Sequence, residues 1–487
     1  MQRALGSVSH LLKSQAYVNG EWIKSSKSYD VINPSTLEKI GSVPDMNQSD
    51  IRDAIACART AQLGWRLKSG NERGQLLRRW LDTVMEHRNA LGTLITLESG
   101  KVLKEGLGEV DYGASYLEWY SEAARRIYGE IIPTQSGMTQ SLLYREPIGA
   151  CAFITSWNFP VLLPLRKTAA ALAAGCTVVL KPSEETPLSA LALAELGDRA
   201  GIPRGVFNVV TSDKSSTPAV GEEMCTNPDI QGLSFTGSCV VGKKLYKLCS
   251  STVKKVTLEL GGNAPFIIFP SADIEVVMRA INTTKFRNNG QTCISANRVL
   301  VHTSRIEEVL ERCVDLIKGK RVADGLEEGA ELGPLINQSA VDKVTRHITD
   351  GVEKGGEVLV GGDKIGNGHF YQPTLLSGLT EDMDIWNEET FGPVIPVRAF
   401  DTEEEAIHLA NNVKEGLAAY VMTTDYRQIH RVTPQLQYGL IGVNEGMISS
   451  VWTPFGGVKE SGIGREGGLQ GINEYLLYKF VSMGGLQ

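Results

Sequence analysis

Apolar residues recur at helical spacing in the first part of the chain. One set lies between residues 51 and 61, and a second lies between residues 76 and 84, before Gly100. Such spacing places the apolar side chains on one face of a helix. We therefore expect helices in this region, covering one face of a sheet.

From residue 149 the pattern changes to short apolar segments that alternate with helical ones. The segments are 149–155, 177–180, 206–210, 232–235 and 256–260. Strands separated by helices predict an α/β fold with a parallel, doubly wound sheet. A second α/β unit follows, and no low-complexity linker separates the two. We expect one rigid body with a cleft between the units.

Three further segments alternate apolar and polar residues as strands do, but lie outside this series. They are 127–132, 141–145 and 475–482. A strand that buries no face within its own subunit often buries it against another copy. We therefore expect an extended arm that joins copies into a homodimer or homotetramer, with a local three-stranded sheet as the alternative.

The composition excludes several classes of partner. The 487 residues carry a net charge of -7, and no basic run would suit nucleic acid or an acidic membrane surface. No apolar run reaches the roughly 18 residues needed to span a bilayer. Residues 1–17 contain Arg3, Lys13 and three serines but no acidic residue. This fits a weak mitochondrial presequence or its remnant, and equally a short disordered tail.

The cysteines and histidines form no metal or disulfide pattern. The eight cysteines, at 57, 151, 176, 225, 239, 249, 293 and 313, include no C-x-x-C, and the seven histidines form no H-E-x-x-H. We expect a reducing compartment, either the mitochondrial matrix or the cytoplasm, and no metal.

One cysteine differs from the others in its neighbours. Cys293 follows the uncharged sequence Asn-Asn-Gly-Gln-Thr, and Arg287 lies six residues upstream. Small and amide-bearing neighbours leave the sulfur open to a small electrophile, whereas a cysteine that only packs is usually embedded in an apolar run. We interpret Cys293 as a thiol nucleophile.

Two other residues suit thiol chemistry. Glu259 ends a predicted strand and precedes two glycines, so a partly desolvated carboxyl there can act as a general base. A salt-bridge partner is the alternative. Asn158 follows the first strand and can donate its amide to a developing oxyanion, and it also suits a turn before Pro160.

A glycine-rich sequence after a strand suggests a phosphate site. A literal G-x-G-x-x-G at 462–467 follows no strand of a βαβ unit, so we reject it. Gly237 to Gly242 follows the strand 232–235 and opens a helix, where the hydroxyls of Thr236 and Ser238 can help to receive a pyrophosphate. A simple helix cap is the alternative.

Lys181 and Glu184 follow the second strand, at the edge where an open α/β sheet binds a nucleotide ribose. A carboxylate beside the 2′ position accepts a hydrogen bond from a hydroxyl but repels a phosphate. Glu184 therefore favours NAD over NADP, with a solvated loop charge as the alternative.

Taken together, these motifs resemble the aldehyde dehydrogenase superfamily over about residues 17–485. The resemblance rests on Trp-Asn-Phe-Pro at 157–160, Phe-Thr-Gly-Ser at 235–238, Leu-Glu-Leu-Gly-Gly at 258–262, Gly-Gln-Thr-Cys at 290–293, Glu-Glu-Thr-Phe-Gly-Pro at 388–393 and Pro-Phe-Gly-Gly at 454–457. It implies that Cys293 adds to an aldehyde, that Asn158 and the Cys293 N–H hold the oxyanion, and that Glu259 activates the hydrolytic water.

The resemblance also implies NAD as the cofactor. The residues expected to bind it are Trp157, Lys181, Glu184, Thr236, Gly237, Ser238, Gly242, Leu260, Glu389 and Phe391. The implied division is an NAD-binding domain of residues 1–126 and 147–261, a catalytic domain of residues 262–470, and an oligomerisation arm of residues 127–146 and 471–487.

Within the superfamily the chain is most similar to the succinate-semialdehyde dehydrogenases, through residues 285–293 and 444–450. This implies oxidation of succinate semialdehyde to succinate in 4-aminobutyrate breakdown. Arg166, Arg287 and Ser449 would grip the substrate carboxylate, with Ser450 as second choice for the hydroxyl. The alternatives are a buried ion pair for Arg166 and a helix C-terminal charge for Arg287.

Other functions remain open. Glutarate semialdehyde is an alternative substrate, because one methylene changes binding by only ~1 to 3 kcal/mol. A catalytically silent structural protein on the same fold, or a pure thiol hydrolase, is disfavoured by the full set of catalytic and ribose-binding candidates.

Three positions depart from the superfamily's usual pattern. Ser156 replaces a frequent proline, which we expect to alter loop stiffness only. Ser295 replaces a second cysteine, so a disulfide switch in this loop is excluded. Pro164-Leu165 precedes Arg166 in place of a more usual pair.

Overall fold

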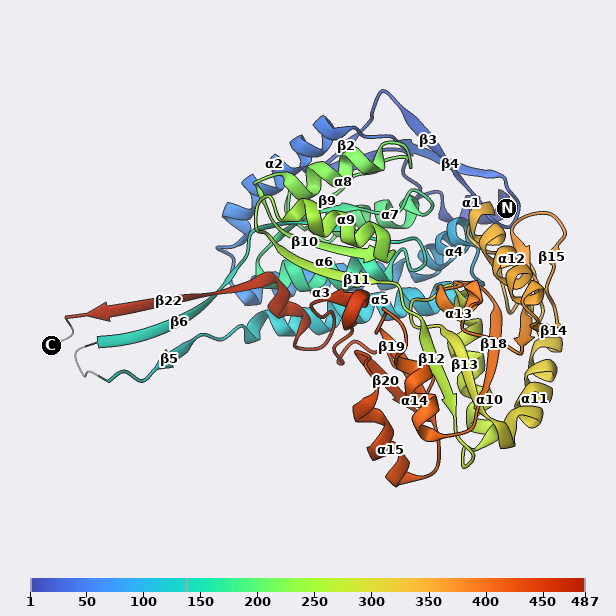
Figure 1. The fold of residues 1–487 in the computed structure, drawn as a ribbon. Helices are drawn as coiled ribbons and strands as arrows, with labels where there is room; N and C mark the ends of the chain where they lie inside the picture. The colour runs from blue at the N-terminus through green and yellow to red at the C-terminus, as the bar shows by residue number, and fades with distance from the viewer. Residues whose placement is uncertain (1, 136–138, 486–487) are drawn as a thin grey trace.

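The computed structural model describes residues 2–135 and 139–485, which form two α/β units and a projecting arm (Figure 1). The first sheet has the order β2-β1-β9-β8-β7-β10-β11-β21. Its five central strands are parallel: β7 (Ala150–Ile154), β8 (Thr177–Lys181), β9 (Phe207–Val209), β10 (Ile230–Gly237) and β11 (Lys255–Leu260). Antiparallel edges come from β1 (Ala16–Val18), β2 (Glu21–Ile23) and β21 (Gly462–Ile463). The predicted parallel sheet is confirmed.

Helices cover both faces of this sheet. One face carries α2 (Gln48–Trp65), α8 (Thr217–Thr226) and α9 (Cys239–Cys249). The other carries α6 (Leu162–Ala174) and α7 (Pro187–Arg199), with α1 (Gln2–Val8), α3 (Gly70–Glu86), α4 (Arg88–Ser99) and α5 (Leu103–Ala123) packed behind them.

The expectation that the early helices cover the same face is wrong. Ile51 of α2 packs in a core with Ala150, whereas Trp80 of α3 packs in a core with Cys151. Successive side chains of a strand point to opposite faces, so α2 and α3 lie on opposite sides of the sheet. Amphipathic spacing identifies the buried face of a helix but not the surface that covers it.

The N-terminal segment belongs to the first core. Val8 and Leu11 are fully buried, in the same cluster as Leu91 and Leu94 of α4. The interpretation of this segment as a disordered tail is therefore wrong.

The second sheet has the order β14-β17-β18-β13-β12-β19-β20. Its parallel strands are β12 (Ala264–Ile268), β13 (Ala296–His302), β17 (Thr374–Ser377), β18 (Val394–Phe400), β19 (Ala418–Met422) and β20 (Leu440–Val443), and β14 (Glu357–Val360) is an antiparallel edge. One face carries α10 (Ile274–Phe286) and α11 (Ile306–Lys318). The other carries α12 (Gln338–Glu353), α13 (Asp384–Asn387), α14 (Glu403–Asn411) and α15 (Tyr426–Val432).

Two small hairpins lie outside these sheets. They are β3 (Ser28–Ile32) with β4 (Lys39–Pro44), and β15 (Lys364–Ile365) with β16 (Phe370–Tyr371). Within the described ranges, no helix is long and apolar enough to cross a membrane.

The arm is a three-stranded antiparallel sheet that extends away from the body (Figure 1). It consists of β5 (Glu130–Ile132), β6 (Thr139–Pro147) and β22 (Leu476–Gly484). Large apolar side chains remain exposed on it, including Ile131 at 72% and Phe480 at 60%. The strand character of these segments is confirmed, and their role in joining subunits remains a prediction.

Candidate active site

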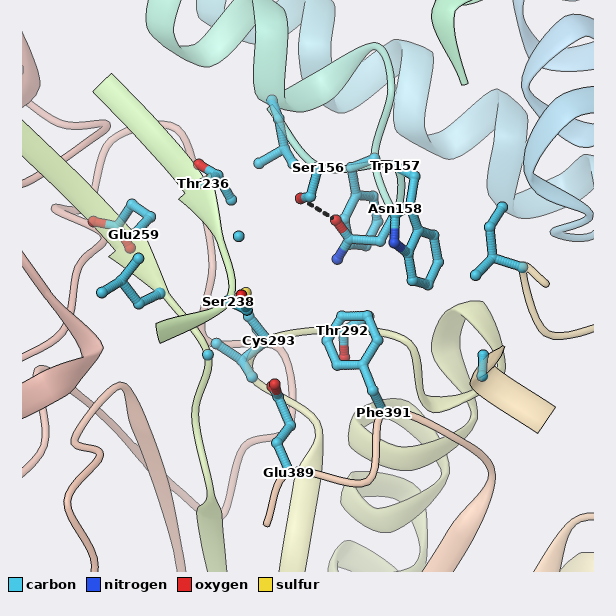
Figure 2. A pocket seen from close by; sticks show the side chains of 18 of the residues that line it. Ser156, Trp157, Asn158, Thr236, Ser238, Glu259, Thr292, Cys293, Glu389 and Phe391 are labelled. Atoms are coloured by element: carbon cyan, nitrogen blue, oxygen red, sulfur yellow. Dashed lines mark hydrogen bonds between the residues drawn. The ribbon is translucent and has the colours of Figure 1, made fainter. Parts of the chain in front are cut away.

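A cavity of about 350 Å³ is lined by residues of both α/β units. The strands β7, β10 and β11 reach it with their carboxyl ends, as expected for ligand sites in open α/β sheets. Of the predicted site residues, those that line it are Trp157, Asn158, Arg166, Thr236, Gly237, Ser238, Glu259, Leu260, Arg287, Cys293, Glu389, Phe391 and Ser449. Figure 2 shows Glu259, Asn158 and Glu389 arranged around the loop that carries Cys293.

The loop before Cys293 has a backbone that few residues tolerate. Asn288 and Asn289 have φ values of 50° and 56°, and Gly290 has a φ of 75°. Asparagine and glycine adopt this left-handed conformation most readily. A Cβ at Gly290 would lie 2.2 Å from the carbonyl oxygen of Gly392, so only glycine fits. The Asn-Asn-Gly sequence therefore fixes the turn that presents the thiol.

The thiol is protonated in the unliganded protein. Burial raises the pKa of Cys293 to about 12, and nearby Glu389 and Glu259 add to the shift, while Arg166 opposes it. Reaction therefore requires that a proton leave the sulfur.

Asn158 is held by hydrogen bonds on both atoms of its side-chain amide. Ser156 Oγ donates to Asn158 Oδ1 at 2.8 Å, and Asn158 Nδ2 donates to the carbonyl oxygen of Gln291 at 3.1 Å (Figure 2 shows the first bond). An amide nitrogen carries two hydrogens, so one is left for a second acceptor. Ser156 therefore does more than alter loop stiffness, because its hydroxyl orients the amide.

Glu259 is buried at the end of β11 with neither carboxyl oxygen hydrogen-bonded to a described residue. Burial and the neighbouring Glu466 raise its pKa well above the usual range. Glu466 itself accepts a hydrogen bond from Lys167, which also donates to Ser234 Oγ at 2.8 Å. The raised pKa favours the neutral carboxylic acid, and Glu259 becomes a base when it loses its proton.

A second buried carboxyl approaches from the other unit. Glu389 Oε1 accepts a hydrogen bond from the Gly262 backbone N–H at 3.2 Å, and burial raises its pKa to about 7. A Cβ at Gly261 would lie 2.7 Å from Glu389 Oε2. Phe391 follows with its ring edge-on to Trp157, 5.5 Å between ring centroids.

Three of the residues predicted to bind the cofactor do not line this cavity. Lys181 ends β8, next to the end of β7, with its Nζ 3.5 Å from Glu184 Oε2. Gly242 lies in α9, where a Cβ would meet the Leu260 side chain at 2.4 Å. Gly242 thus permits close packing of helix against strand, and ligand contacts for all three remain predictions.

The end of the cavity near Arg166 is cationic and aromatic. The buried Arg166 guanidinium lies 3.5 Å from Glu466 and 4.4 Å from the centre of the Phe455 ring. The buried ion pair considered for Arg166 is therefore present, and Arg166 also lines the cavity.

Arg287 lies at the C-terminal end of α10, as considered from the sequence. Its Nη1 contacts Met447 Sδ at 3.0 Å, and its guanidinium lies over the Phe159 ring. Among the described residues it makes no ion pair with a carboxylate, so its charge remains available to a ligand. Ser449 Oγ lies 2.5 Å from the Tyr112 hydroxyl.

Several residues of this site were not predicted from the sequence. Asn337, Ser339 and Lys343, at the start of α12, line the cavity, and Tyr112 of α5 contacts Ser449. Asn337 caps α12 by accepting a hydrogen bond from the Ala340 N–H at 3.0 Å. The N-cap pattern was detectable, but nothing local indicated that this helix begins at the cavity.

Comparison with known proteins decides the family. Residues 22–481 match the model of the aldehyde dehydrogenase family. The chain belongs to that family. It is 47% identical over 478 residues to succinate-semialdehyde dehydrogenase, mitochondrial, of Rattus norvegicus, covering 98% of this chain and 91% of the relative. It is 45% identical over 479 residues to the NADP(+) succinate-semialdehyde dehydrogenase of Escherichia coli (strain K12), covering 98% and 99%.

A solved structure gives the same fold. Betaine aldehyde dehydrogenase from Staphylococcus aureus, in complex with NAD+, is similar with a TM-score of 0.96 at 34% identity, covering 100% of this chain and 98% of that one. The expected fold class is confirmed, and this family member is an oxidoreductase that oxidises aldehydes with NAD(P).

The residues present suit such a dinucleotide. Ser238 caps α9 at the cavity, so this helix N-terminus can receive a pyrophosphate, and Thr236 Oγ1 is buried without a partner among the described residues. Glu389 beside Gly261 and Gly262 offers carboxyl oxygens to a ribose.

Proposed function

We propose that the protein oxidises succinate semialdehyde to succinate, with NAD preferred over NADP. The observation that carries this proposal is the presence of two guanidinium groups, from Arg166 and Arg287, in the same cavity as the Cys293 thiol. An aldehyde that bears a distal carboxylate matches this arrangement, since guanidinium pairs with carboxylate through a bidentate fork. The relatives named above are succinate-semialdehyde dehydrogenases.

Cys293 is the nucleophile in this proposal. The thiol passes its proton to the ionised form of Glu259 as the sulfur adds to the aldehyde carbon, and the carbonyl oxygen becomes an oxyanion held by Asn158 Nδ2 and the Cys293 backbone N–H. Bound NAD would supply the acceptor for the hydride that leaves this carbon as the C=O bond re-forms. Glu259 then releases its proton to solvent and, as a carboxylate, removes a proton from water while the water oxygen adds to the acyl carbon of the thioester. The C–S bond breaks, the thiolate takes up the proton held by Glu259, and the acid is released.

The substrate carboxylate is gripped at the other end. Arg166 and Arg287 supply the charge, and Ser449 supplies a hydroxyl, with Ser450 as second choice. Glutarate semialdehyde is the alternative substrate, since it has the same end groups and one more methylene.

A matched substrate pair tests the proposal. Succinate semialdehyde and butanal have four carbons each and differ in the terminal carboxylate, so kcat/KM measured by NADH absorbance compares them directly. We expect a preference for the acid of about 30-fold or more, the value of a charge-assisted contact. Equal values would contradict the carboxylate grip. Glutarate semialdehyde in the same assay decides the alternative.

The preference for NAD rests on Glu184, whose carboxylate would repel a 2′-phosphate. Glu184→Ser should shift the ratio of kcat/KM for NADP to that for NAD upward by about tenfold. An unchanged ratio would show that the adenosine ribose binds elsewhere.

The domain division and assembly are part of the same proposal. Residues 1–126 and 147–261 would bind NAD, residues 262–470 would hold the thiol, and the arm would join copies into a homodimer or homotetramer through side chains such as Ile131 and Phe480. All eight cysteines are free, and the rat relative is named as mitochondrial, which supports a reducing compartment, the mitochondrial matrix or the cytoplasm.

A further inference from the structure

A buried ion pair lies directly behind the active site. Lys101, just before α5, has its Nζ 2.5 Å from Glu109 Oε2, and each side chain is only 1% exposed. Neither residue lines the cavity. Burial removes both charges from water, so such a pair persists only where further hydrogen bonds satisfy its remaining polar atoms.

Those further bonds end on the Asn158 loop. Lys101 Nζ donates to the Asn158 carbonyl oxygen at 2.7 Å. Glu109 Oε1 accepts hydrogen bonds from the Val161 and Leu162 N–H groups, at 2.8 and 3.2 Å. Val161 and Leu162 begin α6, the helix that carries Arg166 one turn later. The pair therefore fixes both ends of the segment between Asn158 and α6.

The neighbouring turn of α5 holds the nucleophile loop in the same way. Glu105 Oε1 accepts a hydrogen bond from the Asn288 backbone N–H at 2.8 Å. Asn288 Nδ2 in turn donates to the Asn158 carbonyl oxygen at 3.1 Å. The Asn158 carbonyl is thus the point where α5, the Asn158 loop and the nucleophile loop meet.

A second buried glutamate, Glu98, caps a helix without an ion-pair partner among the described residues. Glu98 of α4 accepts hydrogen bonds from the Leu188 and Ser189 N–H groups of α7, both at 2.9 Å. It has no ion-pair partner in the described part of the chain, and burial raises its pKa to about 8. A buried glutamate therefore caps a helix here without a lysine. At Glu109, by contrast, the paired Lys101 also holds the Asn158 carbonyl.

We propose that Lys101 and Glu109 are positioning residues that set the distance between the Asn158 amide and the Cys293 sulfur. This inference rests on the oxyanion role proposed for Asn158. Lys101 fixes the backbone of Asn158, and Ser156 and Gln291 fix its side chain. These bonds fix the direction in which the second hydrogen on Asn158 Nδ2 points.

Two reactions of the Cys293 thiol distinguish positioning of the oxyanion donor from general support of the fold. Hydrolysis of p-nitrophenyl acetate passes through an oxyanion, whereas alkylation of Cys293 by iodoacetamide forms none. The test variant is Lys101→Met with Glu109→Gln, because a single change would leave a buried charge unpaired and risk misfolding. The glutamine oxygen still accepts from Val161 and Leu162, so α6 keeps its cap. Lys104→Met, an exposed lysine on the same helix, is the control.

We expect the double variant to lose about tenfold or more in ester hydrolysis, a smaller loss than complete removal of an oxyanion donor. Alkylation of Cys293, followed by mass spectrometry, should stay within about twofold, and Lys104→Met should match the parent in both reactions. Equal losses in hydrolysis and alkylation, or no loss in hydrolysis, would overturn the inference.

Asn158→Ala, measured in parallel, tests the oxyanion role of Asn158 separately from the positioning role of Lys101 and Glu109. If Asn158→Ala keeps full ester hydrolysis, the oxyanion role itself is wrong and the inference falls with it. If Asn158→Ala loses hydrolysis and the double variant does not, only the positioning role is wrong.

Discussion

The two ends of the cavity hold their charges in opposite ways. Beside Cys293, burial raises the pKa of Glu259 well above its usual range and that of Glu389 to about 7, so these carboxyls can take up and release protons. At the far end, Arg166 and Arg287 are guanidinium groups, which stay protonated at any pH that a protein tolerates. The difference separates reaction from recognition. Groups that exchange protons, such as Cys293 and Glu259, have raised pKa values, whereas groups that select a substrate keep a permanent charge.

The largest effect should come from replacing Glu259, beside Cys293, with a side chain that cannot ionise. Glu259→Gln keeps the shape of the side chain but cannot accept a proton, so thioester hydrolysis should slow by about 100-fold. Stopped-flow absorbance should still show a burst of one NADH per active site, followed by a slow steady state. A steady-state rate equal to that of the parent would assign the base elsewhere.

Removing an arginine from the far end of the cavity should lower activity less, and mainly for the substrate that carries a carboxylate. Arg287→Ala should lower kcat/KM for succinate semialdehyde by about 30-fold, and butanal oxidation should change by less than about threefold. Arg166→Ala should lower both rates, because it also removes an ion-pair partner of the buried Glu466 and a cation that lowers the Cys293 pKa. Equal losses with both aldehydes for Arg287→Ala would mean that this arginine supports the fold of the site instead of gripping a carboxylate. Measurement of both substrates on each variant decides between these outcomes.

The stored proton on Cys293 predicts a pH dependence. A pKa of about 12 means that the thiolate is a minor species at neutral pH and that its fraction grows as the pH rises. The rate of Cys293 alkylation by iodoacetamide, without cofactor, should therefore increase by about tenfold per pH unit between pH 7 and 9. A rate that levels off below pH 8 would show that the resting thiol is already ionised.

The smallest effect is expected for Tyr112, which contacts Ser449 at the far end of the cavity. Tyr112→Phe removes the hydroxyl that lies 2.5 Å from Ser449 Oγ, so the serine loses its orientation. We expect KM for succinate semialdehyde to rise by about fivefold, the value of one neutral hydrogen bond, with butanal unchanged. Tyr128→Phe, in an exposed position, is the control. An unchanged KM would remove Tyr112 from the grip.

The residues that the sequence identified have local signatures. Cys293 stands in an Asn-Asn-Gly turn whose left-handed backbone those residues favour, and Glu259 ends a strand before two glycines. Contacts between segments that are distant in the sequence produce no local sequence pattern. Lys101 reaches Asn158 across 57 positions, and Tyr112 reaches Ser449 across 337.

The same limit explains the misplaced helices. The apolar faces of α2 and α3 could be read from their spacing, but the face of the sheet that each covers depends on how the chain crosses that sheet. The crossing is set by tertiary packing and not by the helix itself.

The contact between Gly290 and Gly392 constrains how this protein can acquire new substrates. The loop of the thiol and the loop after Glu389 touch backbone to backbone there, and any larger residue at 290 would drive them apart. A directed-evolution library should therefore hold residues 288–290 constant. Diversity belongs at positions 112, 287 and 449, which line or contact the far end of the cavity and make no ion pair with a carboxylate among the described residues.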